Sequence, residues 1–405
     1  TVKELSNYIK SKTHMESDLI SKTENAETYF LSSVQEEIYA AALLDDTGIA
    51  YNMYLGLVSK NKIDVNRVHE VYKKLLQRHE VLRYGFFEEN NCIVQKVFDL
   101  DEINSDIEVV YKKIENKECE VEELRNFVQP FNLEIPPLFR IKVIITPGSQ
   151  DIILFNLHHI VADGMSTEIL KEEFIQLYFG KNLEDIELCY KDFCVWSKKN
   201  EWSVEKNFWK KEIETGAESV DLPFDFVRPA IRSFAGDTLS ELIPTSLLDS
   251  INDYCHRAHI TEYVFFTAVF FALLYQYSRQ EELVLGTPFS GRLKKQLQNV
   301  VGMFVNTLPI NCKITNKMSV YELMTQIKDK CLSIQEYQDF PLGEFVKEYK
   351  TSNTSNALFN VLMNYIDFGA DSMESDEFAE RTISINNSIA KFDMSLTINR
   401  SERNC

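Results

Sequence analysis

The stretch Asp151-Ile-Ile-Leu-Phe-Asn-Leu-His-His-Ile-Val-Ala-Asp-Gly164 decides how this chain is interpreted. Residues 151–157 form a largely apolar run typical of a buried strand, and two histidines, an aspartate and a glycine follow. Imidazole is the side chain whose ordinary pKa lies nearest neutrality, so it can accept a proton from an amine or an alcohol. A strand that ends in such groups can hold reactive atoms at the mouth of a cleft. The stretch therefore predicts a catalytic turn at a strand end.

The two histidines are expected to differ in role. Adjacent side chains on a strand point to opposite faces, so at most one of His158 and His159 can face a given cleft. We expect His159 to face it and His158 to be buried and hydrogen-bonded. Asp-Gly at 163–164 is also common turn chemistry, so a purely structural turn is the alternative. No metal is expected, because such histidines are poor chelators and no HExxH or CxxC companion is present.

Composition narrows the class of protein. The chain has 405 residues, which exceeds one ordinary core and predicts two lobes. It has 43 basic against 62 acidic residues, and this net charge of −19 disfavours nucleic acid and anionic membranes as partners. We see no apolar leader and no apolar run of membrane-spanning length, so a cytoplasmic location is expected. The 8 cysteines lack metal spacing and are interpreted as reduced thiols.

Strand-like and helix-like segments alternate along the chain, which predicts an α+β fold in layers. An amphipathic helix is expected over 64–83, and residues 222–229 form a Pro-rich connector. Strands are expected at 92–98, 138–146, 151–157, 237–243, 282–286 and 392–398, and helices at 166–179, 245–258, 261–278 and 318–336. The composition of residues 287–292 indicates a loop.

The pattern His-His-x-x-x-Asp-Gly at 158–164 resembles the acyltransfer motif of the chloramphenicol acetyltransferase-like superfamily. Six further segments, in chain order, resemble the condensation domains of nonribosomal peptide synthetases. They are 31–35 (Leu-Ser-Ser-Val-Gln), 78–83 (Arg-His-Glu-Val-Leu-Arg), 190–196 (Tyr-Lys-Asp-Phe-Cys-Val-Trp), 301–307 (Val-Gly-Met-Phe-Val-Asn-Thr), 337–341 (Tyr-Gln-Asp-Phe-Pro) and 353–359 (Asn-Thr-Ser-Asn-Ala-Leu-Phe). The resemblance covers nearly the whole chain from residue 29.

This resemblance implies two chloramphenicol acetyltransferase-like lobes that form a V-shaped pseudo-dimer, with the active site in a tunnel between them. We expect an N-terminal lobe over 29–197 that carries the motif, and a C-terminal lobe over 198–405. The family usually continues with a further strand and helix, so the C-terminal lobe is expected to be truncated. Residues 1–12 look like the tail helix of an upstream carrier-protein domain, and 13–28 look like a linker.

The implied activity is an acyl transfer that forms an amide bond in nonribosomal peptide synthesis, as in antibiotic and other secondary metabolism. The amine of a downstream carrier-bound aminoacyl thioester attacks an upstream carrier-bound aminoacyl or peptidyl thioester. Both substrates are presented on 4'-phosphopantetheine arms, and no cofactor is expected to be bound covalently to this chain. The implied partners are the two carrier domains and a neighbouring adenylation domain, and we expect a monomer. A carrier directly upstream favours an L-configured donor.

Site residues follow from the matched segments. His159 is the expected catalytic residue, either as general base or as a group that positions the amine and the intermediate. The backbone amide of Gly164 is a candidate oxyanion donor. His158 and Asp163 are expected to shape the turn, and Asp163 to form a buried ion pair with Arg292 that bridges the lobes.

Four more residues are assigned by the resemblance. Arg78 is expected to be an ion-pairing residue of the framework, while Met165, Asn306 and Trp196 are candidates to line the tunnel. Met165 departs from the family, which often has a tryptophan there, and 353–359 lacks the family's usual arginine.

Three alternatives remain open at this stage. The alternatives are an epimerisation domain of the same family, a stand-alone O-acyltransferase and a catalytically inactive docking module. A heterocyclising variant is excluded, because it would carry aspartates in place of the two histidines.

Overall fold

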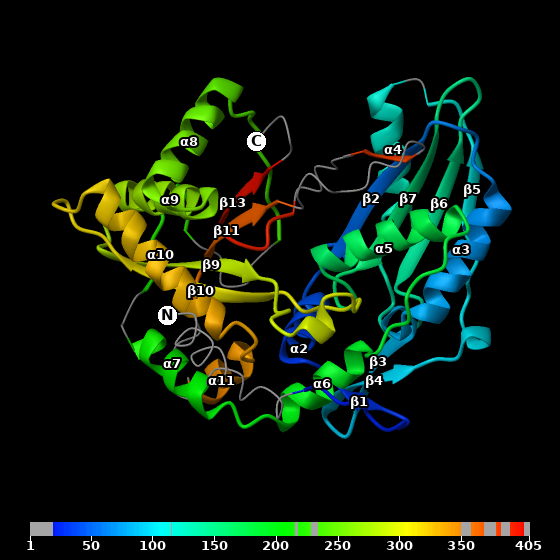
Figure 1. The fold of residues 1–405 in the computed structure, drawn as a ribbon, viewed down its shortest axis with the longest axis horizontal. Coiled ribbons are helices and arrows are strands. Elements are labelled where there is room, and N and C mark those ends of the chain that lie inside the picture. Colours follow the sequence, from blue (N-terminus) through cyan, green and yellow to red (C-terminus); the bar gives the residue numbers. More distant parts are fainter. Residues whose placement is uncertain are drawn as a thin grey trace, which may run out of the picture.

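The computed structural model describes residues 19–114, 116–214, 218–227, 234–349, 358–367, 378–381 and 389–400. They form two lobes that lie side by side, each with its own sheet and helices (Figure 1), so the α+β prediction is confirmed. The predicted carrier helix, 1–12, lies outside the described residues, as do 13–18 of the predicted linker and the C-terminal residues 401–405.

A five-stranded sheet forms the first lobe. Its strands are β2 (Asn52–Ser59), β5 (Glu108–Tyr111), β6 (Phe139–Ile145), β7 (Asp151–His158) and β12 (Phe378–Arg381). The order is β12-β2-β7-β6-β5, and β5–β6 is the parallel pair while the others are antiparallel. The motif strand β7 therefore lies in the centre of the sheet, where both of its edges are hydrogen-bonded.

Apolar side chains cover both faces of β7, which explains its continuous apolar run. On one face, Phe155 packs in the core beneath the helices α3 (Val65–Arg78) and α5 (Gly164–Tyr178). On the other face, Leu154 packs against the helix α4 (Lys117–Phe127). Two faces buried in this way hold the end of β7 rigidly.

Further elements complete the first lobe. They are the helices α2 (Ser33–Leu43) and α6 (Tyr190–Lys199), the 3₁₀ turns η2 (Glu80–Arg83) and η3 (Leu100–Glu102), and a small sheet of β1 (Tyr29–Phe30), β3 (Tyr84–Glu89) and β4 (Cys92–Val97). The predicted helix over 64–83 is wrong in its last turn, because α3 ends at Arg78 and η2 follows after the extended residue His79.

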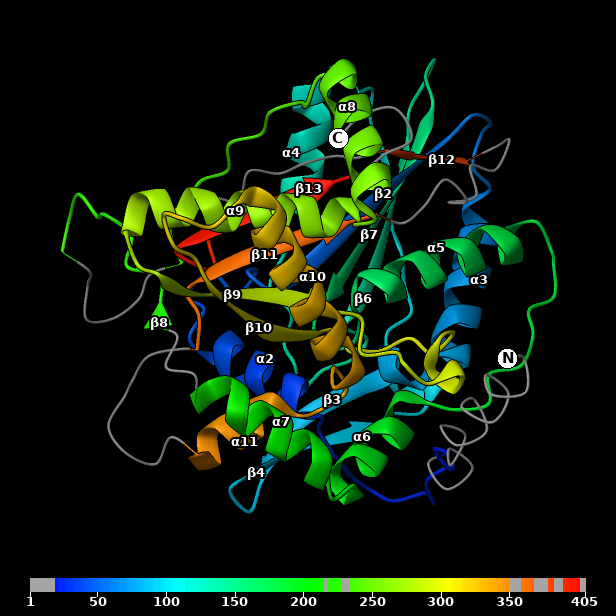
Figure 2. The same ribbon diagram turned by 60° about the vertical axis from the view of Figure 1, so that its left-hand side comes forward.

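The second lobe has its own sheet, with helices on it (Figure 2). The strands are β8 (Glu218–Ser219), β9 (Glu282–Phe289), β10 (Asn306–Lys313), β11 (Val361–Ile366) and β13 (Met394–Asn399); the helices are α7 (Ser203–Glu214), α8 (Thr245–Ala258), α9 (Glu262–Ser278), α10 (Val320–Glu336) and α11 (Leu342–Tyr349). The order β10-β9-β11-β13 makes β13 an edge strand.

One predicted strand of this lobe is absent. Residues 237–243 have no strand partner, and only an isolated bridge joins Ala235 to Ile389. Leu239 and Leu242 are 90% and 77% exposed, so this stretch has no buried face to hold a strand in place.

Segments from the second half of the chain also pack into the first lobe. The strand β12 pairs with β2, and Phe378 lies in the first core. The connection between β9 and β10, which includes the turn η4 (Lys295–Leu297), places Val301 and Phe304 in the same core. The described residues contain no single helix with the length and hydropathy of a membrane span. The helices α8 and α9, which meet at a bend of 104°, have that length and hydropathy only when they are taken together.

Candidate active site

The motif turn joins the end of β7 to the start of α5. Asp163 is the N-cap of α5, and its carboxylate accepts a hydrogen bond from the Ser166 N–H at 2.7 Å. The Asp-Gly pair is therefore a helix start rather than an isolated turn. Gly164 is the first residue of α5, so its N–H has no acceptor within the helix and lies at the positive end of the helix dipole.

His158 is buried and hydrogen-bonded, at 3% exposure. The Ile160 N–H donates to its Nδ1 at 3.2 Å, so we assign the proton of the neutral ring to Nε2. The ring centroids of Tyr51 and Phe131 lie 6.4 Å and 6.1 Å from that of His158. These contacts account for His158 as a packed residue of the framework.

His159 lies half-buried on the opposite side of the strand end. Its backbone N–H donates to the Tyr51 carbonyl at 2.7 Å, and its Nδ1 lies 3.0 Å from the Ala162 carbonyl oxygen. A carbonyl oxygen can only accept, so we assign the proton to Nδ1, which leaves a lone pair on Nε2. The Met303 Sδ lies 3.1 Å from the same Nδ1. The two histidines thus have opposite tautomers.

Both rings are neutral near pH 7. Burial, helped by the adjacent His159 and by Lys391, lowers the pKa of His158 to about 3. Burial lowers the pKa of His159 to about 4, helped by Lys391 and opposed by Asp163. His159 can therefore accept a hydrogen bond at Nε2 over the whole physiological range.

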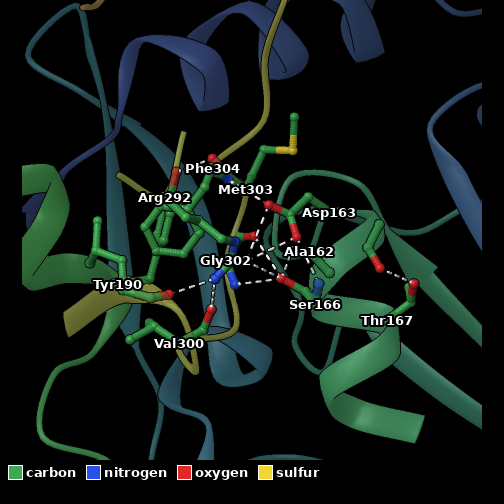
Figure 3. A network of polar contacts seen from close by, with 12 residues as sticks. Ala162, Asp163, Ser166, Thr167, Tyr190, Arg292, Val300, Gly302, Met303 and Phe304 are labelled. Carbon is green, nitrogen blue, oxygen red and sulfur yellow. Dashed lines mark hydrogen bonds and ion pairs between the residues drawn. The ribbon is translucent and has the colours of Figure 1, made fainter. Parts of the chain in front are cut away.

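An ion pair of Asp163 and Arg292 is present, as the sequence analysis predicts (Figure 3). The Arg292 Nη2 lies 3.0 Å and 3.2 Å from the two carboxylate oxygens, and the side chains are 4% and 0% exposed. The Arg292 Nη1 also donates to the carbonyls of Leu297 and Val300, at 2.7 Å and 2.6 Å. The Phe304 N–H donates to the carboxylate at 3.1 Å. The pair therefore ties the motif turn to the connection between β9 and β10.

Ser166 strengthens this tie. Its hydroxyl donates to Asp163 at 2.7 Å and lies 2.9 Å from the Gly302 carbonyl, and the Gly302 N–H donates back to it at 3.0 Å. A Cβ on Gly302 would come within 2.0 Å of the Tyr190 ring, so this close approach needs glycine. The Tyr190 hydroxyl donates to the Met303 carbonyl at 2.5 Å.

The remaining predicted site residues have contacts elsewhere in the fold. Arg78 pairs with Glu173 at 3.0 Å in the framework between α3 and α5. The Asn306 amide donates to the carbonyls of Gln338 and Phe340, at 2.9 Å and 2.8 Å, and so braces the start of β10.

Of the two other predicted tunnel residues, Trp196 is partly buried and Met165 is exposed. The Trp196 ring packs against Trp202 with ring centroids 5.3 Å apart, and the Lys294 ammonium lies 4.7 Å from the Trp196 ring centroid. Met165, in the first turn of α5, is 41% exposed beside the motif.

The sequence analysis missed four residues at the turn: Tyr51, Ser166, Met303 and Lys391. Met303 lies within the matched segment 301–307, which was a usable signal, whereas nothing local marks the other three. No group of three or more metal-ligating side chains occurs among the residues that the structure describes.

Comparisons with known proteins agree with this geometry. The condensation-domain family model matches residues 25–404. Bacitracin synthase 1 of Bacillus licheniformis is 31% identical over 93% of this chain and 7% of its own length. Tyrocidine synthase 3 of Brevibacillus parabrevis is 31% identical over 98% of this chain and 6% of its own length. The chain thus spans a small fraction of these relatives.

Solved structures show the same fold. A four-domain nonribosomal peptide synthetase bound to AMP and glycine matches with a TM-score of 0.81 and 21% identity, over 96% of this chain and 31% of that one. The condensation domain of the Monacolin K polyketide synthase MokA matches with a TM-score of 0.79 and 18% identity, over 94% and 91%. The chloramphenicol acetyltransferase-like architecture is therefore confirmed, and the chain belongs to the condensation-domain family.

Proposed function

We propose that this protein forms an amide bond between two carrier-tethered substrates in nonribosomal peptide synthesis. One observation carries the proposal: His159 stands at a strand end fixed by the buried pair of Asp163 and Arg292, with its Nδ1 3.0 Å from a carbonyl oxygen, which leaves Nε2 available to accept a hydrogen bond. The synthetases named above, which share this chain's sequence pattern over nearly its whole length, support the same setting.

The reaction needs orientation more than activation. A thioester is already reactive, and holding it beside an amine gives a large effective concentration. The amine nitrogen attacks the thioester carbon, a C–N bond forms, and the carbonyl electron pair moves to oxygen. When this pair returns, the C–S bond breaks, and the proton lost by nitrogen ends on the leaving sulfur. His159 accepts a hydrogen bond from the amine, and the Gly164 N–H is the proposed donor to the oxyanion.

The partners follow from this chemistry. Upstream and downstream carrier domains present the substrates on 4'-phosphopantetheine arms, and an adenylation domain loads the downstream carrier. We propose a cytoplasmic location and a monomeric state for the unit. We assign His159 a hydrogen-bonding role rather than full proton transfer, because a pKa of about 4 makes imidazole a weak base toward an amine.

The test mixes the protein with one upstream and one downstream carrier, each loaded with an aminoacyl thioester, and follows both carriers by mass spectrometry. A dipeptidyl thioester on the downstream carrier, lost with His159→Ala, supports the proposal. Inverted stereochemistry without a new bond would indicate an epimerisation domain. An ester made from a soluble thioester would indicate an O-acyltransferase, and binding without product would indicate a docking module. Repeating the assay with D- and L-configured donors tests the expected L preference.

A further inference from the structure

A lysine from the second lobe reaches the histidine turn. Lys391 lies just before the edge strand β13, and in Figures 1 and 2 this strand lies toward β2 of the first lobe. The Lys391 ammonium lies 4.0 Å from the centroid of the Tyr51 ring, a cation–π contact. The backbone carbonyl of Tyr51 accepts a hydrogen bond from the backbone N–H of His159 at 2.7 Å, and the Tyr51 ring centroid lies 6.4 Å from that of His158. One aromatic ring therefore separates this cation from the catalytic motif.

The surroundings of Lys391 compensate its charge only in part. Burial lowers its pKa to about 8, and Asp45 opposes that shift from a distance. The Asp45 carboxylate already accepts N–H groups of Thr47 and Ala50, at 3.0 Å and 2.8 Å. Within the described part of the chain, Lys391 makes a cation–π contact and no ion pair with a carboxylate, whereas Asp163 is paired with Arg292. At each histidine, Lys391 lowers the pKa more than the opposing carboxylate raises it, and that carboxylate is Asp45 at His158 and Asp163 at His159.

The positive charge of Lys391 affects the two roles open to His159 differently. It disfavours an imidazolium, the product of general-base catalysis, because two cations would then share a half-buried space. It favours an oxyanion, which carries the opposite charge. The charge of Lys391 acts on both histidines in this direction, lowering the pKa of each.

We propose that Lys391 is a positioning residue of the condensation site, whose charge stabilises the oxyanion of the tetrahedral intermediate and keeps His159 a neutral hydrogen-bond acceptor. The proposal rests on the function proposed above. Lys391 acts across Tyr51 and through His159, and it exchanges no proton with the substrates. The proton that leaves the amine still ends on the leaving sulfur, so no net charge is left on His159.

The test compares Lys391→Met, Lys391→Arg and the matched control Lys96→Met. Lys96 is also a partly buried lysine over an aromatic ring, 5.3 Å from the Phe98 centroid, but it lies in the small sheet of the first lobe. We expect Lys391→Met to lower kcat by about 10- to 100-fold, less than the loss of a direct oxyanion donor, with KM little changed. Lys391→Arg should retain most of kcat because it keeps the charge, and Lys96→Met should behave as wild type.

A second readout needs no substrate. Each variant is titrated by NMR of isotope-labelled histidine, after thermal unfolding has shown that it is folded. We expect Lys391→Met to raise the pKa of His159 and His158, and Lys391→Arg and Lys96→Met to leave both unchanged. Unchanged kcat and unchanged histidine pKa values in Lys391→Met would overturn the role of Lys391 alone. A wild-type protein that forms no amide bond would overturn the proposed function, whatever the titration shows.

Discussion

Two cations from the second half of the chain reach the histidine turn, and they meet opposite surroundings. Arg292 is held by a carboxylate and two carbonyls in a buried network. Lys391 rests on an aromatic ring, and Asp45 acts on its charge without forming an ion pair with it. Arg292, whose charge is compensated, can fix the geometry of the turn but produces little electric field there. Lys391, whose charge is compensated only in part, produces a field but fixes little geometry. We therefore expect stability to depend on Arg292 and rate to depend on Lys391.

The largest effect is expected at His159, which both Arg292 and Lys391 influence. His159→Ala removes the acceptor for the amine, and we expect amide formation to fall by about 10²–10⁴-fold. The fold should survive, because the ring is half-buried and the hydrogen bond of its Nδ1 is to the nearby Ala162 carbonyl. Single-turnover assays and thermal unfolding measure the two properties. A folded His159→Ala protein with full activity would remove His159 from the mechanism.

The structural half of the comparison is tested by breaking the buried pair. Asp163→Asn and Arg292→Ala should each lower the free energy of unfolding by about 3–5 kcal/mol, because either leaves a buried charge or polar group without its partner. The exposed pair of Lys313 and Glu282, at 2.7 Å, is the matched control, and Lys313→Ala should cost at most about 1 kcal/mol. Urea denaturation measures all three.

The double variant of Asp163 and Arg292 sharpens this test. Once one partner is gone, the loss of the other should cost much less, so the two effects should not add. Simple additivity in urea denaturation would contradict a coupled pair.

Packing around Gly302 gives a smaller effect on the same network. Gly302→Ala places a Cβ against the Tyr190 ring, and we expect a loss of about 1–3 kcal/mol from overpacking. Because the shift would displace the neighbouring Met303, whose sulfur contacts His159, activity should fall as well. Equal stability and activity in Gly302→Ala and wild type would show that the loop relaxes freely.

The effect that is smallest at neutral pH is the titration of the two histidines. Both histidines have a lower pKa in the folded than in the unfolded state, so the unfolded state binds more protons below the ordinary histidine pKa of about 6.5. Their contribution to stability is complete above that pH and is lost as the pH falls through 6.5 toward 4. His158→Phe should flatten the dependence of the urea midpoint on pH. An unchanged slope between pH 4 and 6.5 would contradict the buried neutral ring.

The sequence predicted the motif turn and its ion pair, because local pattern and family resemblance both point to residues 158–164. It did not predict the contact of Lys391 with Tyr51, because these two residues are far apart in the sequence and meet only in the folded chain. Ser166 escaped notice because an N-terminal helix serine is normally solvated, and here the loop at Gly302 covers it. The strand predicted at 237–243 is wrong because the apolar residues of a strand need a partner surface, which this stretch lacks.

The protonation state of His159 is the property whose measurement tests its role as a hydrogen-bond acceptor most directly. Nitrogen-15 NMR of the wild-type protein at pH 7, with His158→Phe and His159→Ala used for assignment, distinguishes the tautomers of the two rings. We expect two neutral imidazoles, His158 protonated on Nε2 and His159 protonated on Nδ1. An imidazolium at His159, or a proton on its Nε2, would contradict a site in which that nitrogen accepts the hydrogen bond of the attacking amine.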